Sequence, residues 1–174
     1  MKTKPFHLAV AVLSLLACSG AFAQNGAQTA AQKSFDQMKS LAGAWQGKDS
    51  EGQNLKVTFR STAGGSALMS EIEGHEDMIS MVHLDGPDRL MLTHYCSMGN
   101  QPRMLATASS DAKVVDFSFL DATNLATPSG GHMQSVVFTV LDANHHTELW
   151  TFNAGPGKQM KEFFDLHRAE VAQK

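Results

Sequence analysis

The densest cluster of reactive side chains in this sequence lies between positions 94 and 103. Its members offer an imidazole, a phenol, a thiol, two carboxamides and a guanidinium: His94, Tyr95, Cys96, Asn100, Gln101 and Arg103. Groups of these types can hydrogen-bond the polar end of a small molecule, and a thiol beside an imidazole can also act as a nucleophile. We therefore place the candidate ligand-binding site in this stretch.

His94 and Cys96 are the pair that nucleophilic chemistry would need. On a strand they share one face and lie about 7 Å apart, from two rises of roughly 3.3 Å. The imidazole would then activate the thiol, with Asn100 or Gln101 stabilising an oxyanion. A two-residue spacing is common by chance, however, and a free cysteine is among the most often buried residue types. We assign no catalytic residue, and an enzyme is kept as the alternative.

Metal binding is a second use for the histidines that follow residue 23, together with Cys96. They are His75, His83, His94, His132, His145, His146 and His167. No H-x-H, HExxH or CxxC spacing places two of the ligands together. His145 and His146 follow the turn at 142–144, and the simplest interpretation of the pair is solvated turn residues. The sequence predicts no metal site unless the fold brings distant histidines together.

The first 23 residues have the organisation of a secretory signal peptide. They contain a basic start at Lys2 and Lys4, an apolar run from Leu8 to Ala17, and the small-x-small triplet Ala21-Phe22-Ala23. The apolar run is too short for a transmembrane helix. We expect cleavage before Gln24 and an exported protein, periplasmic or secreted.

Lipoprotein processing at Cys18 is the alternative to this cleavage. The segment Leu15-Leu16-Ala17-Cys18 is similar to a bacterial lipobox, in which the cysteine is lipidated and becomes the mature N-terminus. In that case the protein is a lipoprotein anchored at Cys18.

Composition limits the functions of the mature chain. Without Lys2 and Lys4 it has 12 Lys and Arg residues and 17 acidic residues, a net charge of −5. A chain of this charge without a basic stripe is a poor nucleic-acid binder. Cys96 is the single cysteine left, so stability must come from a packed core rather than an intramolecular disulfide.

The chain has one helical segment followed by many short strands. Residues 24–33 are assigned as a flexible lead and 34–170 as one domain, and helical periodicity runs from Ala30 to Leu41. Period-two segments then recur between turn signals at 44–48, 54–61, 66–73, 77–84, 89–96, 103–109, 113–120, 132–141, 146–153 and 159–168. Residues 121–131 are expected to form a helical turn or a loop. The spacing predicts an antiparallel all-β sandwich or barrel.

Two motifs carry a resemblance to known proteins. The first, Leu41-Ala42-Gly43-Ala44-Trp45-Gln46-Gly47, together with the strand meander, resembles the calycin superfamily, which includes lipocalins, fatty-acid-binding proteins and nitrobindins. The second, L-T-H-Y-C-x-x-G-N-Q-P-R-M, is similar to an uncharacterised family of exported bacterial lipocalin-like proteins over residues 34–169. The resemblance implies an up-and-down β-barrel of about ten strands with a short N-terminal helix. It also implies that Trp45 closes one end, with Arg168 across its ring.

The resemblance to nitrobindins implies haem bound by a histidine late in the chain, which would be His167. Strand alternation places His167 on the face opposite Phe164 and Leu166, and therefore toward solvent. We expect no cofactor, with haem kept as an alternative.

Methionine is abundant, with nine residues after Met1. Those on or beside the expected strands are Met69, Met78, Met81, Met91, Met98, Met104 and Met133. Flexible thioethers suit either a pocket for varied apolar ligands or the filling of an irregular core. We predict a small-molecule-binding barrel that holds a hydrophobic or amphipathic ligand, with no nucleic-acid partner and no membrane span. The alternatives are an enzyme using His94 and Cys96, a haem- or metal-binding barrel, and a structural envelope protein.

Overall fold

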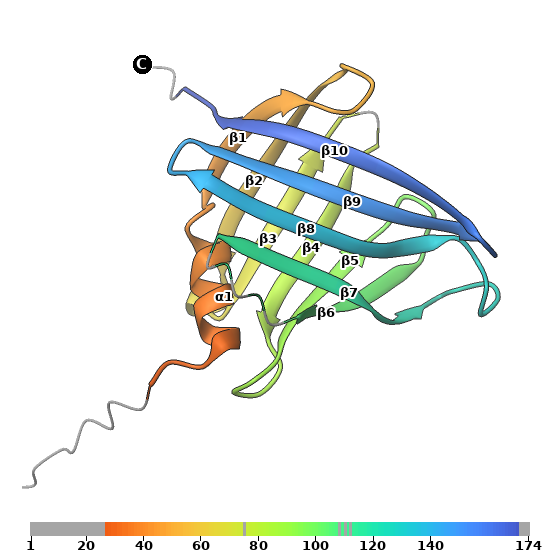
Figure 1. Cartoon of the computed structure of the whole chain (residues 1–174), viewed down its shortest axis with the longest axis horizontal. Helices are drawn as coiled ribbons and strands as arrows, with labels where there is room; N and C mark the ends of the chain where they lie inside the picture. Colours follow the sequence, from red (N-terminus) through yellow and green to blue (C-terminus); the bar gives the residue numbers. More distant parts are fainter. Residues whose placement is uncertain (1–26, 75, 108, 110, 112, 171–174) are drawn as a thin grey trace, which may run out of the picture.

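The fold is an antiparallel β-barrel of ten strands with one α-helix at its N-terminal side (Figure 1). The computed structural model describes residues 27–74, 76–107, 109, 111 and 113–170. The helix is α1 (Ala30–Lys39), and a single 3₁₀ turn spans Ala63–Gly65. The strands are β1 (Gly43–Lys48), β2 (Asn54–Thr62), β3 (Ala67–Glu73), β4 (Met78–Leu84), β5 (Leu90–Tyr95), β6 (Gln101–Thr107), β7 (Val114–Thr123), β8 (His132–Asp142), β9 (His145–Gly155) and β10 (Lys158–Arg168).

Each strand pairs with the next one in the sequence, and β1 pairs with β10 to close the barrel. The predicted all-β, up-and-down barrel with a short helix is therefore confirmed. The ten predicted strands correspond one to one with the ten observed. In the stretch expected to hold a helical turn or a loop, β7 continues to Thr123 and an irregular connection leads to β8.

Helix α1 covers one end of the barrel (Figure 1). The hydroxyl of Thr29 caps it by accepting a hydrogen bond from the Gln32 backbone N–H. Phe35 and Met38 are buried on the helix face that the period of three to four predicts. Because the helix begins at Ala30, residues 30–33 belong to the folded domain. The proposed signal segment and Cys18 lie outside the described residues.

The barrel closes through the motif around Trp45. Gly47 allows β1 to approach β10 closely, because a Cβ atom there would lie 1.8 Å from the carbonyl oxygen of Asp165. The Arg168 Cζ atom lies 4.2 Å from the centroid of the fully buried Trp45 ring, the contact that the resemblance implies. Arg168 also donates to the carbonyl oxygens of Ala42 and Ala143, each at 3.0 Å. One guanidinium therefore ties the helix exit, the β8–β9 turn and β1 together.

Strand alternation fills the interior near the helix with apolar side chains. Phe59, Phe117, Phe138, Leu92 and Leu166 are almost fully buried there, in one continuous core. In the described part of the chain, neither helix is long and apolar enough to cross a membrane.

Candidate functional site

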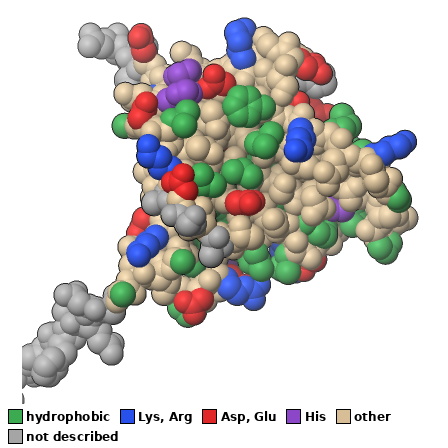
Figure 2. Space-filling view, viewed as in Figure 1, with side chains coloured by type: hydrophobic (Ala, Val, Ile, Leu, Met, Phe, Trp, Pro, Cys, Tyr) green, Lys and Arg blue, Asp and Glu red, His purple; other side chains and the backbone are tan. Residues whose placement is uncertain are grey.

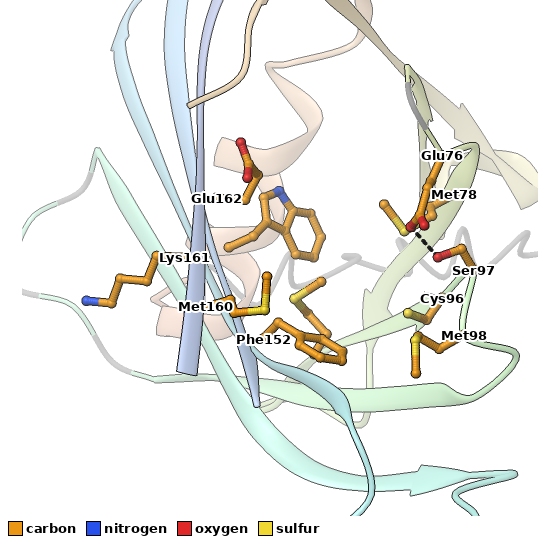
Figure 3. A pocket seen from close by; sticks show the side chains of 11 residues that line it. Glu76, Met78, Cys96, Ser97, Met98, Phe152, Met160, Lys161 and Glu162 are labelled. Atoms are coloured by element: carbon orange, nitrogen blue, oxygen red, sulfur yellow. Dashed lines mark hydrogen bonds between the residues drawn. The ribbon is translucent and has the colours of Figure 1, made fainter. Parts of the chain in front are cut away.

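A cavity of about 300 Å³ opens at the barrel end away from α1 (Figure 3). Its lining is mainly sulfur and aromatic carbon, with a few polar groups at the mouth. The lining residues are Glu76, Met78, Cys96, Ser97, Met98, Met133, Trp150, Phe152, Met160, Lys161 and Glu162. The volume lies at the lower end of the range typical of small-molecule sites, about 300–1,000 Å³.

The long strands β8, β9 and β10 build one side of this cavity. Alternation along β9 turns Trp150 and Phe152 inward, and alternation along β10 does the same for Met160 and Glu162. The start of β4 and the turn between β5 and β6 supply the facing side. In Figure 3 the sulfur atoms of both sides point into the same space.

The mouth of the cavity is acidic. Glu76 accepts a hydrogen bond from the Ser97 hydroxyl, and Glu162 accepts one from the Ser50 backbone N–H at 2.8 Å. Both carboxylates also line an adjoining cavity of about 300 Å³ that contains two more acidic residues, Asp49 and Glu51. Lys161 is the basic residue of the lining, and its side chain points away from the cavity in Figure 3.

Buried hydrogen bonds fix the orientation of Trp150, the cavity's indole. Its Nε1–H donates to Glu148 Oε2 at 2.8 Å, and Glu148 Oε1 lies 3.1 Å from His146 Nε2. Glu148 and His146 are fully buried, and the His146 ring meets the Trp45 ring edge-on at 4.3 Å between centroids. A polar chain therefore connects the cavity with the closed end and holds the Trp150 ring in one position.

His94 lies inside the barrel beside Trp150, which lines the cavity. Its imidazole is 5.0 Å from Trp150 between ring centroids, and Nδ1 lies 2.9 Å from the Ser80 hydroxyl. Nε2 is buried and has no hydrogen-bond partner. Burial lowers the pKa of His94 from 6.5 to about 4, so the ring is neutral near pH 7.

Cys96 is a half-buried free cysteine at the lip of the cavity. The hydrogen bond of His94 goes to Ser80 on the neighbouring strand and not to Cys96. A neutral, buried imidazole bound to a serine does not activate a thiol, so the geometry gives the nucleophile alternative no support.

Asn100 and Gln101 connect the loops of the rim. Asn100 is buried and its Nδ2 donates to the Gly131 carbonyl at 2.8 Å, which ties the β5–β6 turn to the β7–β8 connection. Gln101 donates to the Gly99 carbonyl at 3.0 Å and accepts from the Thr123 hydroxyl at 2.8 Å. Both residues therefore hold the mouth in shape, and contact with a ligand stays a prediction for them.

Tyr95 and Arg103 lie on the outer side of the barrel wall. Tyr95 is exposed, as its position next to the inward His94 requires. Arg103 Nε donates to Asp121 Oδ1 at 2.6 Å across β6 and β7, and this bond lowers the pKa of the Asp121 carboxyl. The structure brings Cys96 alone of the six predicted residues to the cavity lining.

Sequence reasoning identified part of the cavity through its methionines. Four of them line it: Met78, Met98, Met133 and Met160. Met160 is not among the methionines named from the sequence, although it falls within the expected strand at 159–168. Met104 is fully buried in the core and not at the cavity. Trp150 and Phe152 share one face of β9, but which end of the barrel they approach depends on strand register.

Two predictions about histidines have different outcomes. His146 is fully buried, so its interpretation as a solvated turn residue is wrong, because the second residue of β9 already points inward. His167 faces solvent, as alternation predicts, with 60% of its side chain exposed. A haem in the barrel would need an inward histidine late in the chain, so the residues at His167 do not fit the group that the nitrobindin resemblance implies.

Comparisons with known proteins extend the description of the fold. No protein-family model matches the sequence, and a search of curated proteins finds no match. Among solved structures, the crystal structure of Rv2717c from M. tuberculosis is similar, with a TM-score of 0.57 and 13% sequence identity over 79% of this chain and 98% of that one. At this identity the likeness shows the fold alone, and it fits a calycin-like barrel.

Proposed function

We propose that this protein is an exported binding protein that holds a small hydrophobic or amphipathic molecule in the cavity at the open end of its barrel. The observation that carries the proposal is the lining of methionine, tryptophan and phenylalanine side chains around about 300 Å³ of space. When a ligand displaces water from apolar surface of this kind, binding becomes more favourable by about 25 cal/mol for each Å² removed from water. Thioethers adapt to ligands of different shape.

The charge at the mouth favours ligands with a cationic or neutral polar end. Glu76 and Glu162 lie at the mouth, with Asp49 and Glu51 beside them. Potentials of one sign attract ligands of the opposite sign and repel those of the same sign. An anionic headgroup would meet these carboxylates on entry, so fatty-acid-like anions are expected to bind less tightly than cationic amphiphiles of equal chain length.

Support for export comes from the order of residues at the start of the sequence. The basic, apolar and small-residue segments occur in the order of a signal peptide. The intact mass of the exported protein tests this part. A chain that begins at Gln24 or at a lipidated Cys18 supports it, and a full-length chain contradicts it.

Intrinsic fluorescence tests ligand binding directly. The sequence has two tryptophans, of which Trp150 lines the cavity and Trp45 is buried under Arg168 at the other end. We expect decyltrimethylammonium, titrated below its micelle concentration, to change the Trp150 emission and to saturate. Decyl sulfate has the same tail and the opposite charge, and it should bind more weakly at low salt.

Charged substitutions at the lip provide the matched test. Met98 and Met160 are 63% and 64% exposed, so Met98→Lys and Met160→Lys should fold normally. Each should weaken binding by about tenfold, because a cation replaces apolar contact worth roughly 1.4 kcal/mol or more. Leu120→Lys, at an exposed site on the outer wall, should leave binding unchanged. A linear, unsaturable change, or an equal loss in the Leu120 control, would contradict the proposal.

A further inference from the structure

Three potential metal ligands meet on the outer wall of the barrel, away from the cavity. Asp165 and His167 are two residues apart on β10 and therefore share its outer face. His145, the first residue of β9, is the direct cross-strand partner of His167. Figure 2 shows histidine side chains beside acidic ones on this side of the molecule.

The ligand atoms of these three residues converge. His145 Nε2 lies 2.6 Å and His167 Nε2 lies 3.9 Å from Asp165 Oδ1, and the three atoms all lie within 4.8 Å of one another. The two imidazole rings are stacked, with centroids 4.2 Å apart and planes 20° apart. Bonds of about 2.0–2.2 Å to one ion would place such atoms roughly 3 Å apart. A bound ion would therefore draw His167 Nε2 closer to Asp165 Oδ1 than the present 3.9 Å.

The cluster is accessible and its charge suits a cation. The His145, Asp165 and His167 side chains are 28%, 52% and 60% exposed, so an ion can reach them from solvent. Lys48 is the cross-strand neighbour of Asp165 on β1, but its ammonium donates to the Gly52 carbonyl and to Asn54 Oδ1. Its charge is therefore directed toward the β1–β2 turn and not over the cluster.

We propose that His145, Asp165 and His167 form a binding site for a divalent transition-metal ion. Two imidazoles and one carboxylate are a donor set that zinc, nickel and copper accept, whereas magnesium and calcium prefer oxygen ligands. Water completes the coordination, because the site faces solvent. A bound ion links β9 to β10 beside the closing contact of Arg168, which donates to the Ala143 carbonyl just before β9. The site is independent of the cavity and of any ligand bound there.

A Zn²⁺ titration of the tag-free protein tests this site. The Cys96→Ser background removes the thiol that would otherwise compete for the metal. Isothermal titration should show one Zn²⁺ bound per chain, with Ni²⁺ and Cu²⁺ also binding and Mg²⁺ giving no heat. Because an ion that joins two strands binds the folded state, Zn²⁺ should also raise the melting temperature.

Variants at the ligands and at a matched histidine decide the outcome. His145→Ala, His167→Ala and Asp165→Asn should each weaken Zn²⁺ binding by more than about tenfold, since even an outer-shell partner is worth that much. The three side chains are half-buried or exposed, so melting temperatures without metal should confirm that the variants fold. His83→Ala removes a histidine elsewhere on the barrel and should bind like the background protein. Binding that survives in His145→Ala/His167→Ala, or no Zn²⁺ binding at all, would overturn the site.

Discussion

At the scale of single residues, several polar side chains inside the barrel form specific hydrogen bonds. Glu148 bonds both Trp150 and His146, and His94 bonds Ser80. Buried polar groups without such bonds cost free energy, so these contacts select one arrangement of the interior side chains. Burial also disfavours the charged form of an ionisable side chain, and it lowers the pKa of His94 for this reason.

We predict that His94 makes the protein less stable in mild acid. Its pKa is about 4 in the folded state and has the ordinary value of 6.5 when unfolded, so the unfolded chain binds the extra proton between these values. The free energy of unfolding should therefore fall as pH decreases from about 6.5 to about 4, by up to roughly 3 kcal/mol from this group. Above about pH 6.5 its contribution is constant.

The His94→Gln variant checks this assignment through denaturant unfolding over the same pH range. The variant keeps a group that can bond Ser80 but cannot titrate, so its stability should depend less on pH. If His94→Gln and wild type lose stability in parallel, another group is responsible.

At the scale of elements, the sequence predicted the strands well because their signals are local. Alternation and turn residues predicted a strand at each of the ten places where the structure has one. Alternation also places Arg103 outward once its neighbour Met104 is inward. The cluster of His145, Asp165 and His167 depends on the register between β9 and β10, which spacing along the chain does not contain.

We predict that Gly47→Ala prevents normal closure of β1 against β10. The new methyl group would overlap the Asp165 carbonyl, and the atoms that it would meet belong to the backbone and cannot rotate away. The free energy of unfolding should fall by about 2–3 kcal/mol or more, measured by denaturant titration. Gly74→Ala is the control, because its Cβ would meet a Leu55 atom at an ordinary 3.5 Å. An equal effect of both substitutions would show that close strand approach is not what Gly47 provides.

At the scale of the whole molecule, the two ends of the barrel have different roles. Helix α1, Trp45 and Arg168 close one end over a filled apolar core. The long strands β8–β10 leave the other end open, with methionine and aromatic side chains around its cavity (Figure 1 and Figure 3). The sequence left open whether the interior is filled or hollow, because that depends on how side chains from ten strands share one volume.

The methionine methyl groups provide the most direct test of the central proposal that the open end binds ligands. In a methyl-labelled sample titrated with decyltrimethylammonium, we predict saturable shifts at the four cavity methionines, Met78, Met98, Met133 and Met160. Met38 lies on α1 and Met104 in the core, and both are fully buried, so they should keep their resonances. Shifts spread equally over all methionines, or none at the cavity, would contradict the account.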